Sequence, residues 1–267
     1  MISWPLLRSV AARHAPFLTA VGLLLGLFQF LICAVLASID LGSLLQSLLR
    51  SLPPLAQELI VTQFGGLSER DLLAFGWNHP VSQALGTAAA IVVASHAVAG
   101  EIETGAMELL MSQPLSRRCY LATRVCFAML ALAILTLAGS AGTLLGQRYY
   151  GLERFEPGRI PALAGSWFLL QMGWFGIGLA LSAFGREGGR TASIAFLLAI
   201  VSYFGQAIGR MWSEASFVLP WTLHHYFDPR GILVQGALPW RAWITLAAVL
   251  GAGIGVAGWR FGRRDLP

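Results

Sequence analysis

The sequence predicts an all-α membrane protein with six transmembrane helices. Of its 267 residues, 56% are hydrophobic and only 12% are charged, whereas charged residues make up about a quarter of ordinary soluble domains. The mean hydropathy is +0.68. The apolar residues fall in long runs and do not alternate with polar ones, unlike the strands of a membrane barrel. We therefore expect residues 1–267 to form a single membrane domain.

Six apolar runs predict the membrane spans. Crossing a hydrocarbon core of about 30 Å takes roughly 20 helical residues. The expected spans are residues 16–39, 81–100, 120–146, 161–184, 191–209 and 242–259. The second run is the weakest, because Gln83, Ser95 and His96 interrupt it.

Three further segments predict helices at the membrane surface. Residues 2–14 mix apolar side chains with arginines, as in an amphipathic helix that lies at the interface. The long loop 40–80 carries leucines at helical spacing over 44–52, and prolines follow them. Residues 210–240 are rich in tryptophan and broken by three prolines, which predicts short interfacial or re-entrant helices on the outer face.

The arginines indicate the orientation of the chain. All 18 basic residues are arginine, and the net charge is +5. If the N-terminus is cytoplasmic, the inner segments hold ten arginines and five acidic residues, and the longer outer segments hold eight of each. Positive charge concentrates on the cytoplasmic side of membrane proteins. We therefore expect both termini in the cytoplasm and the protein in the inner (plasma) membrane.

The absence of lysine excludes two kinds of chemistry. A P-loop needs a lysine that reaches the β- and γ-phosphates of a nucleotide, and a Schiff-base enzyme needs a lysine amine. The expected spans also hold hardly any ionisable side chain except His96, whereas ion-driven carriers usually have acidic groups at membrane depth. Energy for pumping would therefore have to come from another polypeptide. The arginines are scattered between apolar runs, so nucleic acid is not an expected partner.

The segment 100–118 is the most informative part of the sequence. Glutamates crowd its start, Leu109, Leu110 and Met111 form an apolar patch, and Pro114 and Arg117 follow. Glutamates near the start of a helix and arginines near its end stabilise it through the helix dipole. An apolar patch with charges around it is also typical of a helix that docks on another protein. The residues alone leave both interpretations open.

This segment resembles the cytoplasmic loop after the second span of ABC type-2 exporter permeases. Ala106 stands where these permeases usually have threonine. Weaker similarities follow in the family's order at 185–190, 225–229 and 259–266. The matching residues are Gly100, Glu101, Glu103, Gly105, Glu108, Leu109, Leu110, Pro114, Ser116 and Arg117.

The resemblance implies a type V exporter-like fold and a function as the permease subunit of an ATP-driven exporter, similar to drug or antibiotic efflux permeases. ATP and Mg would bind to two copies of a separate ATPase subunit, with no cofactor on this chain. A second permease subunit would complete the pathway, most simply as a homodimer in the lipid bilayer. The residues assigned to ATPase docking are Glu101, Glu103, Gly105, Glu108, Leu109, Leu110, Pro114 and Arg117.

Other classes of function stay open from the residues. A transporter or channel that works without an ATPase is the main alternative, and a membrane-embedded enzyme is a weaker one. His96 is a candidate proton switch, His224, His225 and Asp228 are a weak candidate metal cluster, and Glu101 with Glu108 is a weak acid/base pair. Small residues spaced by four predict close helix packing, namely Gly205 with Gly209 and Gly251 with Gly255.

Overall fold

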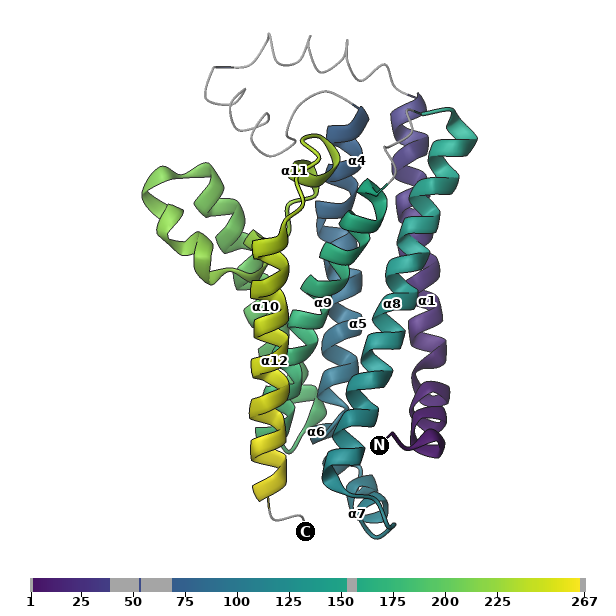
Figure 1. The fold of residues 1–267 in the computed structure, drawn as a ribbon, viewed down its shortest axis with the longest axis vertical. Helices are drawn as coiled ribbons and strands as arrows, with labels where there is room; N and C mark the ends of the chain where they lie inside the picture. The colour runs from purple at the N-terminus through teal and green to yellow at the C-terminus, as the bar shows by residue number, and fades with distance from the viewer. Residues whose placement is uncertain (1, 39–52, 54–68, 153–157, 265–267) are drawn as a thin grey trace.

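The computed structural model describes residues 2–38, 53, 69–152 and 158–264, and over these residues it is helical and contains no strand. This confirms the all-α prediction. The molecule is an elongated bundle, with the start of α1, the short helix α7 and the end of α12 at the same end (Figure 1). The helices are α1 (Trp4–Ser38), α4 (Glu69–Asn78), α5 (Pro80–Ser95), α6 (Ala99–Glu103), α7 (Ala106–Met111), α8 (Arg117–Tyr150), α9 (Arg159–Phe184), α10 (Gly188–Met211), η1 (Ser213–Trp221), η2 (Leu223–Tyr226), α11 (Pro229–Leu233) and α12 (Trp240–Arg263).

Within the described residues, α1, α8, α9, α10 and α12 are long and apolar enough to cross a membrane. They cover five of the six expected spans, the first of them as far as Ser38. The boundaries of the second expected span, residues 81–100, are wrong: α5 has only 16 residues and ends at Ser95. The helix α4 occupies residues that were expected to be loop. It ends directly before α5 and lies above it in line (Figure 1). The helix expected over 44–52 lies outside the described residues.

The helix α9 forms the centre of the bundle and contacts α5, α8, α10 and α12. Its tryptophans Trp167 and Trp174 are buried. Its closest approach is to α12, where a Cβ atom on Gly253 would lie 2.3 Å from the carbonyl oxygen of Gly176. Because real Cβ atoms do not come this close, only glycine at position 253 permits this crossing.

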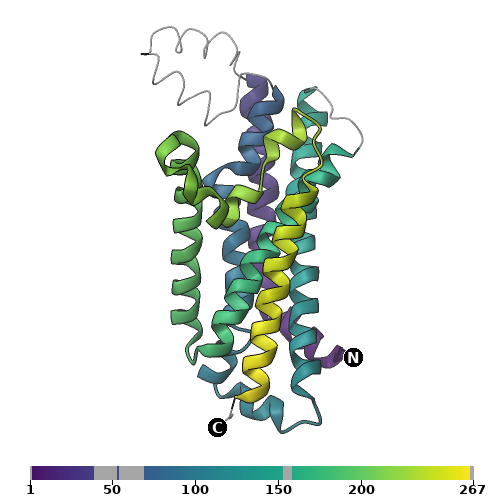
Figure 2. The same cartoon turned by 60° about the vertical axis from the view of Figure 1, so that its left-hand side comes forward.

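The helix α1 packs along α8 with a similarly close approach. A Cβ atom on Gly142 would lie 2.1 Å from the carbonyl oxygen of Gly26. The prediction of a separate interfacial helix over 2–14 is wrong, because one helix runs from Trp4 to Ser38 through Pro16. Proline removes a backbone hydrogen bond and bends a helix. The first turns of α1, beside the N-terminus, lie at an angle to the rest of the helix (Figure 2).

The glycines predicted to pack helices lie in two different environments. In α10, Gly205 and Gly209 face η1, where their nearest neighbours are Thr222, Val218 and Leu219. These two glycines therefore pack a short connecting helix and not a neighbouring span. In α12, a Cβ on Gly251 or Gly255 would meet nothing within 4 Å. The α12 glycine that packs within the chain is Gly253.

Short helices do form between α10 and α12, as the prolines and tryptophans of 210–240 predict. They are η1, η2 and α11, and α11 lies beside α4 at the end of the bundle opposite α7 (Figure 1). Arg230 of α11 donates a hydrogen bond of 2.9 Å to the Asp71 carboxylate of α4. This ion pair joins two segments that are 159 residues apart. Their position relative to a bilayer stays a prediction.

Candidate functional site

The segment between α5 and α8 lies at the end of the bundle that carries the start of α1 (Figure 1). The prediction of one helix over 100–118 is wrong, because the segment forms two short helices, α6 and α7. Gly105 separates them with a φ of 71°, a left-handed conformation that glycine adopts without strain. Pro114 lies in the non-helical stretch before Ser116, whose side chain accepts a hydrogen bond from Cys119 N and begins α8.

Glu101 is the centre of a buried ion cluster. One of its carboxylate oxygens, Oε1, accepts hydrogen bonds from Arg124 of α8 and from Arg13 of α1, the latter at 2.8 Å. The side chains of Glu101 and Arg124 are 2% and 1% exposed. A buried charge without a partner costs roughly several kcal/mol. Separation of Glu101 from the arginines would carry this cost, so the ion pairs hold α6 against α1 and α8.

Arg124 also binds the end of α5. Its Nη2 atom donates to the carbonyl oxygen of His96 at 3.0 Å, and its Nε atom donates to the Tyr120 hydroxyl at 3.0 Å. The Tyr120 hydroxyl in turn donates to the carbonyl of Ala97 at 2.5 Å. The last carbonyls of a helix lack partners within it and carry partial negative charge. At the break between α5 and α6, the guanidinium of Arg124 supplies a hydrogen-bond donor to the carbonyl of His96 and a positive charge close to it.

Ser182 of α9 holds the same break from the other side. Its hydroxyl donates to the carbonyl of Ser95 at 3.0 Å and accepts from the backbone N–H groups of Val98 and Ala99 at 3.2 and 2.9 Å. One side chain therefore bridges the end of α5 and the start of α6. The chain can leave the helical path here without leaving these buried backbone groups unpaired.

Glu103 connects α6 to α10. Its Oε2 atom accepts a hydrogen bond of 2.8 Å from the backbone N–H of Gly188, the first residue of α10. A carboxylate at a helix start is favourable because the free N–H groups there carry partial positive charge. Through Glu101 and Glu103, the five-residue helix α6 contacts α1, α8 and α10.

Arg117 binds the end of α12. Its Nη1 atom donates to three carbonyl oxygens at the end of α12, those of Phe261, Gly262 and Arg264, at 2.8, 3.1 and 2.7 Å. Arg264 donates in turn to the carbonyls of Ala183 and Gly185 at the end of α9, both at 2.8 Å. Burial lowers the pKa of the Arg264 guanidinium from its ordinary value, and the charges of nearby arginines lower it further. Arg117 therefore links the start of α8 to the ends of α12 and α9.

The helix α7 presents part of its surface to solvent. Met107 is buried, Leu110 is half-buried, and Leu109 is 73% exposed beside the exposed Glu108. The apolar patch predicted from the sequence is therefore divided: Leu110 and Met111 pack against the chain's own core, and Leu109 points outward. An exposed apolar side chain next to a carboxylate is available for contact with another protein.

The structure places the other candidate residues as follows. His96 is the C-cap residue that follows α5 and is exposed, with its ring 5.9 Å from that of His14. His224 is buried, and its Nδ1 atom lies 3.0 Å from the Ser202 hydroxyl. Among the described residues, no three His, Cys, Asp or Glu side chains are grouped as metal ligands. Glu101 is paired with arginines and Glu108 is exposed on another helix, so these two carboxylates do not form an acid/base pair.

The sequence model of the ABC-2 family transporter proteins matches residues 21–217, which include α6, α7 and their contacts with α8, α9 and α10. The chain belongs to this family. It is a membrane permease of an ABC transporter, as the resemblance implied. A comparison with curated protein sequences finds no match.

Sequence reasoning did not find the residues that hold the permease's 100–118 segment in place. Arg13, Arg124 and Ser182 come from three different helices, up to 169 residues apart in the chain. Arg124 left a signal that could have identified it: a single arginine inside an apolar run of a membrane helix usually faces the protein interior and a partner. Ser182 left none, because small polar residues are common in membrane helices.

Proposed function

We propose that this permease is the subunit of an ATP-driven exporter that couples to a separate ATPase through α6 and α7. The observation that carries the proposal is the combination of an outward surface on α7 with the ion pairs and hydrogen bonds of the adjoining helix α6. Leu109 and Glu108 are exposed, and Glu101 and Glu103 of the adjoining helix contact α1, α8 and α10. A protein that moves α7 would therefore move the ends of three long helices.

The charges of the cluster support such a transmission. Glu101 and Arg124 meet through Oε1 and Nη2. Their other polar atoms, Glu101 Oε2 and Arg124 Nη1, are buried and have no hydrogen-bond partner among the described residues. A buried polar atom without a partner is costly. In a second arrangement of α6, these atoms could gain hydrogen-bond partners. The free energy gained in this way would offset part of the free energy needed to tilt α1 and α8. The two arrangements would correspond to inward- and outward-open states.

The partner supplies the nucleotide chemistry. The chain contains no lysine, so ATP and Mg would bind to the ATPase. Two ATPase subunits that close on two nucleotides need two docking surfaces, one for each subunit. One copy of this chain offers a single docking surface, on α7. The proposed complex therefore contains two permease and two ATPase subunits, with the permeases forming a homodimer.

We further propose that α4 and α5 together form the sixth crossing. Their combined length with His79 is 27 residues, about 40 Å at 1.5 Å per residue, which is enough for a bilayer of ~30 Å. Six crossings return the chain to its starting side, in agreement with the shared end of the bundle on which α1 begins and α12 ends (Figure 1). Both termini would then lie in the cytoplasm, with the protein in the inner (plasma) membrane.

Purification of the permease from its native host, followed by identification and native mass measurement of every associated chain, tests this proposal. The expected result is a complex of two permease and two ATPase chains. One permease per two ATPases would refute the homodimer. A permease that transports in vesicles without any ATPase would support the alternative of an independent transporter or channel.

A further inference from the structure

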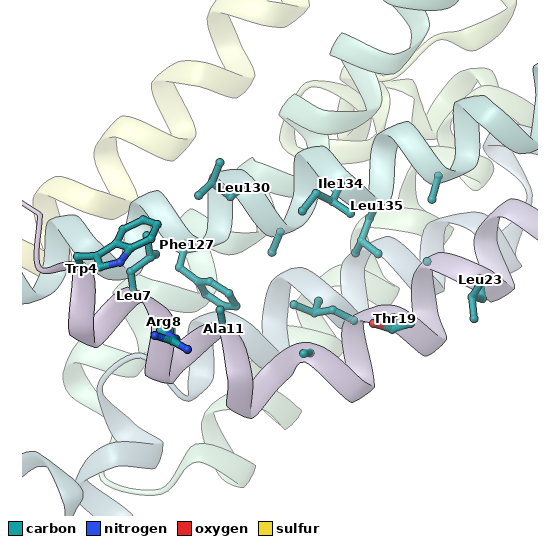
Figure 3. A pocket seen from close by; sticks show the side chains of 15 residues that line it. Trp4, Leu7, Arg8, Ala11, Thr19, Leu23, Phe127, Leu130, Ile134 and Leu135 are labelled. Carbon is teal, nitrogen blue, oxygen red and sulfur yellow. The ribbon is translucent and has the colours of Figure 1, made fainter.

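A long apolar groove runs between α1 and α8 (Figure 3). Its volume is about 630 Å³, within the range of about 300–1,000 Å³ that is typical of sites for small ligands. Fifteen side chains line it, and Arg8 is the only charged one. The α8 wall is formed by aliphatic and aromatic residues such as Phe127, Leu130 and Ile134.

The groove is polar at one end and apolar along the rest. Trp4 and Arg8 lie at the end near the N-terminus, and Leu23 lies at the other end (Figure 3). From Arg8 to Leu23, the path along the bent helix α1 is about 22 Å at 1.5 Å per residue. Half of a bilayer including its headgroups measures about 20–22 Å. The groove therefore has the length and polarity of one phospholipid in a single leaflet.

Arg8 differs from the arginines at this end of the molecule that bind the protein itself. Arg13, Arg117 and Arg124 bind carboxylates or carbonyls of the chain. The side chain of Arg8 is exposed and has no hydrogen bond or ion pair with any residue in the described part of the chain. A guanidinium binds phosphate oxygens through charge-assisted hydrogen bonds, and arginine and tryptophan favour the headgroup level of a membrane.

We propose that this groove binds one phospholipid of the leaflet on the N-terminal side, with its phosphate on Arg8 and one acyl chain along Ala15 and Thr19. The charge at one end favours a lipid over a second copy of the chain, because a helix packed along the groove would need an acidic partner for Arg8 and a wholly apolar face above it. The proposal does not depend on the ATPase or on which side of the membrane is cytoplasmic.

The first test compares two arginines on the delipidated protein in detergent micelles. The protein is titrated with dipalmitoylphosphatidylglycerol, and native mass spectrometry measures the fraction that carries one lipid. Arg8→Gln should weaken this binding about ten-fold, as expected for the loss of a charge-assisted contact. Arg118→Gln is the matched control, since Arg118 is also exposed near this end but does not line the groove; it should bind as the wild type does.

The second test fills the groove. Ala15→Phe places a ring in the apolar part, and Ala12→Phe places the same ring on an exposed part of α1 outside the groove. The first change should lower lipid binding roughly ten-fold and the second should leave it unchanged, with the melting temperature of each variant showing that it is folded. A photoreactive acyl chain on the lipid should label peptides of α1 and α8.

The outcomes that overturn the proposal are specific. If dipalmitoylglycerol, which lacks the phosphate, binds the wild type as tightly as the phospholipid does, Arg8 does not recognise a phosphate. If Ala15→Phe leaves lipid binding unchanged and converts a dimer to a monomer, the groove is an interface between two copies. If all four variants bind the phospholipid as the wild type does, the groove is not a lipid site.

Discussion

At the scale of single residues, the buried pair of Glu101 and Arg124 is expected to determine the stability of the permease. Arg124→Leu removes the guanidinium and leaves the Glu101 carboxylate buried, with only the half-exposed Arg13 as a partner. Breaking a buried ion pair in this way costs about 3–5 kcal/mol. The melting temperature in detergent, followed through the fluorescence of the nine tryptophans, should fall clearly.

A double variant separates the ion pair from the other contacts of Arg124. Adding Glu101→Gln to Arg124→Leu removes the uncompensated charge, so the double variant should melt above Arg124→Leu alone. Arg118→Leu, a change at an exposed position six residues earlier on the same helix, should leave the melting temperature unchanged. Equal melting of Arg124→Leu and Arg118→Leu would show that the buried pair contributes little.

At the scale of elements, α7 is expected to bind the ATPase through Leu109. Leu109→Asp places a charge on the exposed face of α7 and breaks no contact of the buried Met107 behind it. The ATPase should therefore be lost from the purified complex, while the yield of folded permease in the membrane stays the same. Burial of one leucine is worth roughly 1.5–3 kcal/mol, enough to lower the retained ATPase about ten-fold or more.

The control for α7 is Gln113→Asp, which adds the same charge at an exposed position beyond the helix. It should retain the ATPase. If Leu109→Asp also retains the ATPase and its transport-linked hydrolysis, α7 is only a surface helix with no docking role.

The crossing of α9 and α12 depends on one glycine. Gly253→Leu would place its Cβ atom 2.3 Å from the Gly176 carbonyl, whereas Gly255→Leu would meet nothing within 4 Å. The first variant should force the helices apart and reduce both the yield and the melting temperature of the permease, as overpacking does. The second should fold normally as a single subunit. Similar melting of the two variants would show that α12 shifts along α9 at little cost.

The elements differ in how far the sequence predicts them. Long apolar runs predict the five long helices, because lipid requires about 20 consecutive apolar residues whatever surrounds them. The ends of the helices are harder to predict from the sequence. The end of α5, for example, depends on Ser182 and Arg124, which lie far from it in the sequence. The spacing of small residues suggested Gly251 and Gly255, but which face of α12 meets α9 depends on the packing of the whole bundle. The same spacing occurs in α1, where Gly22 and Gly26 face Leu135 and Ala138 of α8.

At the scale of the whole molecule, the charge distribution and the fold lead to one topology. The segment between α5 and α8 lies at the end of the bundle where α1 begins and α12 ends (Figure 1), and arginines outnumber acidic residues in the segments assigned to that side. Ser68 lies outside the described residues and directly precedes α4 in the sequence, and α4 belongs to the opposite end of the bundle. Gln113 follows α7 and is exposed. These two positions are therefore expected on opposite sides of the membrane.

Cysteine labelling in intact cells measures this arrangement. In a variant whose three cysteines are replaced by serine, Ser68→Cys should react with a membrane-impermeant maleimide added outside. Gln113→Cys should react only after the cells are opened, because the positive charge around it keeps its side of the bundle in the cytoplasm. Reversed labelling would place α7 outside the cell, where no ATP-driven partner is available, and would refute the coupling proposal together with the orientation. Labelling of both positions from outside would instead contradict a sixth crossing by α4 and α5. This pair is the only proposed crossing between residues 68 and 113, so the two positions lie on opposite sides only if the pair spans the bilayer.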